Sequence, residues 1–196
     1  PHHTMMPEYL ESLGMLVGWT QDMNNSGLIF DYEGTAETPF GVYRSLGIST
    51  MPTIAIHDGM VALAYASTTE TFVTADGLYN YKHIWTRFSY DLGQTWGLFH
   101  DLQAGNIFHL YDECIYPVLA PNPNPEGAFQ LIYQADNTPG LFLDEDHEPV
   151  INRVIHNSMS FTVGIDKPLP VATSLSVSQS YPNPTSDTTQ VTIEIA

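Results

Sequence analysis

Three segments of this chain share one pattern, and this repetition constrains the fold more than any single residue does. Each begins with a large apolar residue and a proline, continues as a short apolar run, turns at a glycine and leaves as a second apolar run. The segments are Met6–Trp19, Met51–Ala66 and Tyr116–Gln134. Apolar runs of strand length joined by glycine turns predict β-hairpins. Their recurrence at intervals of about 45 and 65 residues predicts an all-β fold assembled from similar sheets.

The second segment opens the clearest unit, which extends to residue 102. Its expected strands cover 53–57, 60–67, 83–89 and 97–102, with a loop over 68–80. The third unit is expected to form strands over 117–120, 128–134 and 152–159. The first unit is clear only as a hairpin over 6–19. Prolines and glycines interrupt nearly every window long enough for a helix, so we expect strands and turns throughout.

One motif stands between the third and fourth strands of the second unit. Ser89, Asp91, Gly93, Thr95 and Trp96 are spaced so that a tight hairpin can be built from them. The aspartate can accept backbone N–H bonds from the residues after it, and the glycine supplies a positive φ angle. The tryptophan leaves the turn and is expected to pack its ring against the sheet.

This motif resembles the Asp-box, or BNR repeat, of sialidase-like β-propellers. The resemblance implies a partial β-propeller of about three four-stranded blades, in which the five motif residues are structural. Propellers close with about four to eight blades. We therefore expect the remaining blades either before Pro1 or from partner chains.

The sialidase resemblance also implies a catalytic set. It consists of three arginines that bind a carboxylate, a tyrosine nucleophile paired with a glutamate, and an aspartate that acts as the acid. The arginines of this chain are Arg44, Arg87 and Arg153. Arg44 lacks the Ile-Pro that follows the first arginine of the family, and the other two fall on expected third strands. No catalytic residue is therefore assigned, and the sequence favours a binding module over an enzyme. A glycoside hydrolase and a structural component of a cell-surface assembly stay open as alternatives.

The charge of the chain excludes several classes of partner. It has 5 basic and 22 acidic residues, for a net charge of −17. A nucleic-acid groove needs clustered Lys and Arg, and anionic membrane surfaces repel such a chain. No apolar run approaches the length of a membrane helix. The single cysteine, Cys114, allows no internal disulfide, and we expect it to be a small buried residue.

Acidic residues give two candidate metal sites. Asp144, Asp146 and Glu148 alternate in one loop and could offer oxygen ligands to calcium, the one candidate cofactor. The run from His109 to Cys114 combines His, Asp, Glu and Cys, which suit a transition metal or simply a connection between blades. Asp136 and Asn137 follow a second strand and are candidate ligand contacts.

The C-terminal stretch changes character. A Pro-, Ser- and Val-rich linker, placed at 166–174, leads into 175–196, where Tyr181, Pro182, Asn183 and Pro184 form a turn before an alternating strand over 188–195. This stretch resembles the opening of the C-terminal sorting domain of type IX secretion substrates, a small β-sandwich. The resemblance implies a secreted or cell-surface protein of a Bacteroidetes-type bacterium, with the sorting domain truncated. The sequence thus predicts a propeller portion over 1–165, exported by the type IX machinery, that binds an unidentified glycan, polymer or protein.

Overall fold

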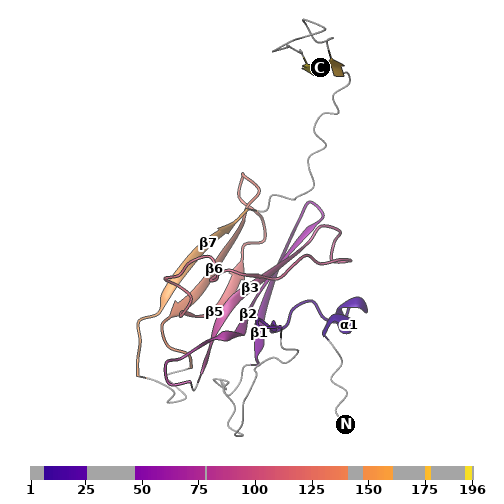
Figure 1. Ribbon diagram of the computed structural model, residues 1–196. Coiled ribbons are helices and arrows are strands. Elements are labelled where there is room, and N and C mark those ends of the chain that lie inside the picture. The colour runs from indigo at the N-terminus through magenta and orange to yellow at the C-terminus, as the bar shows by residue number, and fades with distance from the viewer. Residues whose placement is uncertain are drawn as a thin grey trace, which may run out of the picture. The chain divides into compact units, whose positions relative to one another are not determined.

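The computed structural model describes residues 7–25, 47–77, 79–140 and 148–160, and the backbone of 175–177 and 193–195. The chain divides into two compact units, Pro1–Ser160 and Phe161–Ala196. The described part of the first unit holds one short helix and two antiparallel sheets (Figure 1). The predicted all-β class is confirmed at this level.

Sheet A is an antiparallel meander of four strands in chain order. These are β1 (Ser49–His57), β2 (Met60–Val73), β3 (Asn80–Ser89) and β4 (His100–Asp101). Asp58 and Gly59 join the first two, with φ angles of 47° and 81°. Positive φ at both residues is the requirement of a two-residue hairpin turn, which Asp-Gly meets at little cost.

Sheet B repeats the first three strands of this meander. It consists of β5 (Glu113–Leu119), β6 (Phe129–Asp136) and β7 (Arg153–Met159). All its pairs are antiparallel. The part of the chain that the structure describes places no fourth strand in this sheet.

The two sheets share an irregularity at the same place. In sheet A the register shifts between Thr50 and Thr53, and in sheet B between Ile115 and Val118. The residue before each proline, Met51 or Tyr116, has a φ of 55°. Proline cannot donate to a strand ladder, so it is accommodated at a bulge. The prolines therefore lie inside strands, about four residues after the strand begins, rather than at the strand starts that the sequence suggested.

Sheet B packs against one face of sheet A, since β5 contacts β1, β2 and β3. We call this covered face the B-face of sheet A; Ala62, Ala64 and Ala66 on it are fully buried. The packed face of sheet B carries Leu119, Leu131 and Tyr133. Small residues on one side and large ones on the other let the sheets approach closely, which gives the dense interior expected of a folded core.

The last strand of sheet A is much shorter than the predicted 97–102. Only Trp85 and Thr86 pair with β4. Beyond them, the Leu102 and Gly97 N–H groups still donate to the β3 carbonyls of Ile84 and Phe88. Two β3 N–H groups are bonded by side chains instead: Gln103 Oε1 accepts the Ile84 N–H at 2.8 Å, and Glu113 Oε2 accepts the Lys82 N–H at 2.6 Å. These side chains replace a strand, since a buried N–H without an acceptor is costly. The predicted loop over 68–80 is also shorter, because the β-branched run after Ser67 continues β2 to Val73.

The predicted first hairpin is wrong over its described part. Residues Pro7–Ser12 form α1, and residues 13–25 contain no strand. Pro7 opens the helix, where its missing N–H costs nothing, and Gly14 ends it with a φ of 69°. The N–H groups of Gly14 and Met15 donate to Glu11 O and Leu10 O. The proline and glycine that suggested a hairpin are thus the start and stop signals of a helix.

In the second compact unit, Phe161–Ala196, β8 (Leu175–Val177) pairs antiparallel with β9 (Ile193–Ile195). The alternating strand predicted over 188–195 is thus represented by β9, and its partner lies in its own chain. The expected sorting turn, Tyr181–Pro184, lies outside the described residues.

Candidate binding site

The motif residues Ser89, Asp91, Gly93, Thr95 and Trp96 lie between β3 and β4, and the first four form a closed hydrogen-bonded loop. Asp91 Oδ1 accepts the Thr95 N–H at 2.8 Å, and its Oδ2 accepts the Thr95 hydroxyl at 2.6 Å. Ser89 Oγ donates to Asp91 Oδ1 and accepts the Gly93 N–H, both at 2.7 Å. Gly93 has a φ of 89°, which favours glycine. Each motif hydroxyl or carboxylate is therefore bonded within the turn.

The hairpin depends on the ionised form of Asp91. Hydrogen bonds from Thr95 and Ser89 lower the pKa of this carboxyl from 3.8 to about 2. Because the folded-state pKa is depressed, this contribution to stability is present above pH 3.8 and is lost as the pH falls through about 2. We expect Asp91→Asn to lower the melting temperature at neutral pH and to flatten its decline between these two pH values. Circular dichroism melts measure this, and parallel wild-type and variant profiles would contradict it.

Trp96 leads from the hairpin to the face of sheet A opposite sheet B. We call this the N-face, because residues 15–23 lie on it. Its buried cluster is Leu63, Tyr65 and Trp85, against which Val17, Met23, Trp96 and Phe99 pack. The predicted packing of the motif tryptophan on the sheet is observed.

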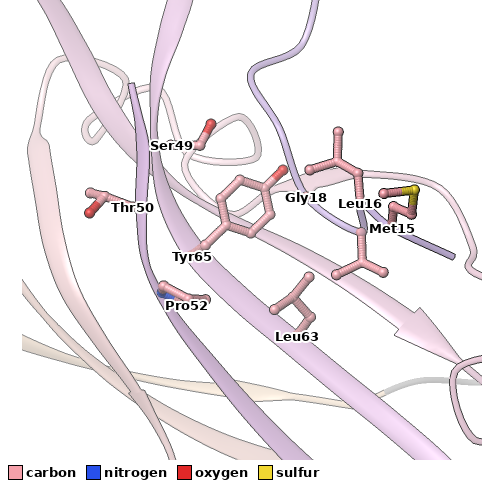
Figure 2. Close-up of a pocket in the computed structure, with 9 residues that line it drawn as sticks. Met15, Leu16, Gly18, Ser49, Thr50, Pro52, Leu63 and Tyr65 are labelled. Carbon is pink, nitrogen blue, oxygen red and sulfur yellow. The ribbon is translucent and has the colours of Figure 1, made fainter. Parts of the chain in front are cut away.

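A pocket of about 250 Å³ remains on the N-face between residues 15–18, part of the N-terminal segment (residues 7–25), and strands β1 and β2 (Figure 2). Figure 2 shows Met15, Leu16 and Gly18 on one side of the Tyr65 ring and Ser49, Thr50 and Pro52 along β1. Val17 and Leu63 complete the lining. A Cβ at Gly18 would lie 2.9 Å from the Tyr65 ring, so glycine permits this close approach. None of the lining residues is acidic or basic, which suits a neutral and largely apolar group.

Three hydroxyl groups form a ring at one end of the pocket. Thr20, Ser49 and Ser67 lie 2.9–3.0 Å from one another, oxygen to oxygen. Each hydroxyl can donate to one neighbour and accept from the other, so the ring satisfies its own donors. Ser49 belongs to both the ring and the pocket wall. The ring therefore holds β1, β2 and the N-terminal segment together without adding charge to the pocket.

Tyr65, the one titratable group in the pocket wall, is committed to the protein. Its hydroxyl donates to Trp19 O at 2.9 Å. Burial raises the pKa of this phenol well above its usual range. A tyrosine nucleophile needs a lowered pKa or an adjacent base. This geometry suits binding better than covalent catalysis.

A second set of buried polar groups lies between the sheets. Glu113 is 1% exposed, and its Oε1 has no hydrogen-bond partner among the described residues. Burial, with the nearby Asp136 carboxylate, raises the pKa of Glu113 well above 4.5. The Lys82 ammonium donates to Gly47 O, Ile48 O and Thr68 Oγ1, each at 3.1 Å, and burial lowers its pKa to about 8. A carboxyl of raised pKa is typical of a general acid, but this one faces the interior rather than the pocket.

Two of the arginines serve packing and ion pairing. Arg87 is 4% exposed and bonds to main-chain and side-chain oxygens of the chain itself. Arg153 Nη2 lies 2.7 Å from Asp112 Oδ1, and His109 Nδ1 lies 2.6 Å from Oδ2 of the same carboxylate. Arg44 lies outside the described residues. The sequence did not predict that Arg87 joins the N-terminal segment to the hairpin after β3, because no local motif points to the residues that it contacts.

The remaining predicted residues are placed as follows. Asp144 and Asp146 lie outside the described residues, and Glu148, the third predicted calcium ligand, is exposed. Asp136 is buried at the end of β6 and accepts the Thr138 N–H, whereas Asn137 is exposed. Cys114 is buried, as expected, and burial raises the pKa of its thiol. Among the described residues, no three His, Cys, Asp or Glu side chains are placed to hold a metal ion together.

Comparison with models of protein families, with curated proteins and with solved structures gave no significant match in any of the three. Within the described residues no helix is long and apolar enough to cross a membrane.

Proposed function

We propose that this chain is part of a secreted or cell-surface Asp-box β-propeller, exported by the type IX machinery, that binds a protein ligand through the N-face pocket. The two sheets are then neighbouring blades. Their common bulge, their common strand order and the hydrogen-bonded Asp-box hairpin support this interpretation. The export route rests on the resemblance of residues 175–196 to sorting domains.

The observation that carries the binding function is the uncharged pocket on a strongly acidic chain. Its wall is formed by Met15, Leu16, Val17, Leu63 and Tyr65, with hydroxyls at one end. Its volume of about 250 Å³ falls just below the range of about 300–1,000 Å³ that is usual for whole small-molecule sites. A single aliphatic or aromatic side chain presented by a protein fits this size better than a glycan, which would need more polar partners.

The pocket can be tested with a small probe. Isobutanol combines a branched apolar body with one hydroxyl, so it mimics a side chain that can also bond to Ser49 or Thr50. We expect it to shift the methyl NMR signals of Leu16, Val17 and Leu63 in the folded protein. Apolar cavities of comparable size take up small organic molecules in this way.

Two matched variants make the probe test decisive. Leu16→Asp places a charge in the pocket wall and is expected to abolish the shifts. Leu98→Asp makes the same change at a position that is 80% exposed and outside the lining, and is expected to preserve them. Shifts that are absent in the wild type, or that survive Leu16→Asp, would refute binding at this pocket.

A further inference from the structure

The outer edge of β1 is a free strand edge. In the part of the chain that the structure describes, β1 pairs with β2 and with no second strand. A two-residue turn follows His57, so this residue and Met60 close the ladder as a hydrogen-bonded pair. Antiparallel strands alternate between hydrogen-bonded and non-hydrogen-bonded pairs. Ile54 and Ile56 therefore direct their main-chain N–H and C=O groups away from β2.

These outward groups have no partner among the described residues. The hydrogen bonds made outside the strand ladders include none to the main chain of Ile54 or Ile56. Both residues are 56% exposed, so a partner can reach them. Pro52 and the bulge interrupt the edge just before Ile54, which keeps the free stretch short. Unpaired N–H and C=O groups along a strand form a template for one more extended strand.

Strand β5 shows that an N–H group in this position points away from its own sheet. Leu119 and Ile54 hold the same place in their strands, three residues after the positive-φ residue of each bulge. The Leu119 N–H donates to Thr53 Oγ1 of β1 at 3.2 Å. Sheet A thus supplies an acceptor to the outer edge of β5, whereas the Ile54 N–H has none among the described residues.

The free edge is continuous with the pocket. Pro52 lines the pocket and precedes Ile54 by two residues in the same strand, and Figure 2 shows it beside the Tyr65 ring. Residues 15–23 cover the buried cluster of the N-face but leave Ile54 and Ile56 exposed. The side chains of a strand paired with β1 would alternate between the two faces of sheet A. Every second one therefore lies on the side that carries the pocket.

Charge selects the sign of the partner. The chain has a net charge of −17, and the Asp58 side chain at the end of β1 is 90% exposed. The pocket wall itself has no charged residue. A segment that carries lysine or arginine is attracted to this edge, and an acidic segment, such as a second copy of this chain, is repelled.

We propose that the protein ligand is an extended, basic segment of another protein, which adds a strand to the outer edge of β1 at Ile54 and Ile56 and places one apolar side chain in the pocket. Main-chain hydrogen bonds along the edge supply affinity, and the pocket supplies specificity. The proposal rests on the proposed binding function of the pocket and names the chemistry of its partner.

Amide hydrogen exchange of the protein alone tests whether the edge is free. We expect the amides of Ile54 and Ile56 to exchange fast, and those of Ala55 and His57, which face β2, to exchange slowly. Slow exchange at Ile54 and Ile56 would mean that the edge is already paired and would overturn the proposal. Exchange that slows as protein concentration rises would identify a second copy as the occupant and would overturn it equally.

A designed peptide tests the strand pairing. The probe is a blocked seven-residue peptide of alternating lysine and valine, and we expect it to slow exchange at Ile54 and Ile56. Its affinity should fall as salt rises, and a glutamate–valine peptide should not bind. Two isomers, N-methylated on the valines or on the lysines, each lack the N–H groups of one strand edge. We expect one isomer to bind like the parent and the other at least about tenfold more weakly. Equal behaviour of the two isomers would refute pairing.

Ile54→Pro tests the edge within the protein. Proline removes one outward N–H and leaves the ladder to β2 intact, because an edge strand accepts proline on its open side. We expect peptide binding to weaken by at least about tenfold while the isobutanol shifts stay unchanged. Circular dichroism checks the fold, and Ile56→Pro replaces this variant if it does not fold. Ile151→Pro, at a position that is 87% exposed, is the matched control and should bind the peptide like the wild type.

The outcomes separate this inference from the proposed function. Isobutanol shifts without peptide binding would overturn the strand pairing and would still support the pocket as a binding site. Absence of both would refute the two proposals together. Leu16→Asp is expected to weaken peptide binding, since the pocket takes one side chain of the ligand. Peptide binding that this variant leaves unchanged would show that the edge acts without the pocket, and would overturn the proposal as stated.

Discussion

Arg87→Ala is expected to lower the free energy of unfolding by about 3–5 kcal/mol, the usual cost of removing one partner from a buried ionic network. Its guanidinium donates to Gly97 O at 2.8 Å, to Val17 O at 3.3 Å and to Glu11 Oε1 at 2.7 Å. It also lies 4.0 Å from the centre of the Phe99 ring. The substitution removes the donor of these bonds and the link between the N-terminal segment and the Ser89–Trp96 hairpin. Urea unfolding followed by tryptophan fluorescence measures the loss.

Two variants separate the buried network from an ordinary surface charge. Glu11→Gln removes the ion pair but keeps the bonds from Arg87 to the main chain, and is expected to cost no more than about 1 kcal/mol. Arg153→Ala makes the same change as Arg87→Ala at a side chain that is 42% exposed, with a similarly small expected cost. If Arg87→Ala costs no more than Arg153→Ala, the network does not hold the N-terminal segment.

Glu113→Gln is expected to remove a large part of the pH dependence of stability. The folded-state pKa of Glu113 is raised, so its contribution to stability is fully present below 4.5 and is lost as the pH rises through the folded-state pKa. Between those limits one such group lowers the free energy of unfolding by up to about 1.4 kcal/mol per pH unit. Glutamine keeps an oxygen to accept the Lys82 N–H and cannot ionise. We therefore expect the variant to gain stability relative to the wild type as pH rises.

Urea unfolding at a series of pH values between about 5 and 7 measures this difference, below the range in which Lys82 titrates. Any constant cost of burying the amide shifts the whole curve without changing its slope. Glu126→Gln, at an exposed position, serves as the control and should run parallel to the wild type. A Glu113→Gln curve that is also parallel would show that the pKa of the Glu113 carboxyl is the same in the folded and unfolded states.

Local patterns were reliable where one turn determines the outcome. Asp58-Gly59 and the Ser89–Trp96 motif each contain the residues that their backbone angles and hydrogen bonds require. The Pro7–Gly14 stretch was misjudged because proline and glycine punctuate helices as well as hairpins, and six helical residues are too few to show a period. A glycine therefore predicts a hairpin turn correctly at Gly59 and incorrectly at Gly14, where it ends a helix.

The pocket and the Arg87 network could not be predicted from the sequence. Val17 and Arg87 are 70 residues apart, and Thr20 and Ser67 are 47 apart. Neither pair carries a motif, since hydroxyls and a lone arginine are ordinary surface residues until a fold buries them. From the sequence, Glu113 was a candidate metal ligand in the run from His109 to Cys114. In the structure its carboxyl lies against β3 and accepts the Lys82 N–H.

The sequence by itself determined much of the local geometry: apolar strands, the Asp58-Gly59 turn and the Ser89–Trp96 hairpin, because these depend on backbone angles and hydrogen bonds within a few residues. Only the tertiary structure decided which faces are covered and which are bare. Ala64 and Ile132 hold equivalent places in their strands, yet one is buried and the other half exposed, since burial depends on what packs against a face and not on the strand itself.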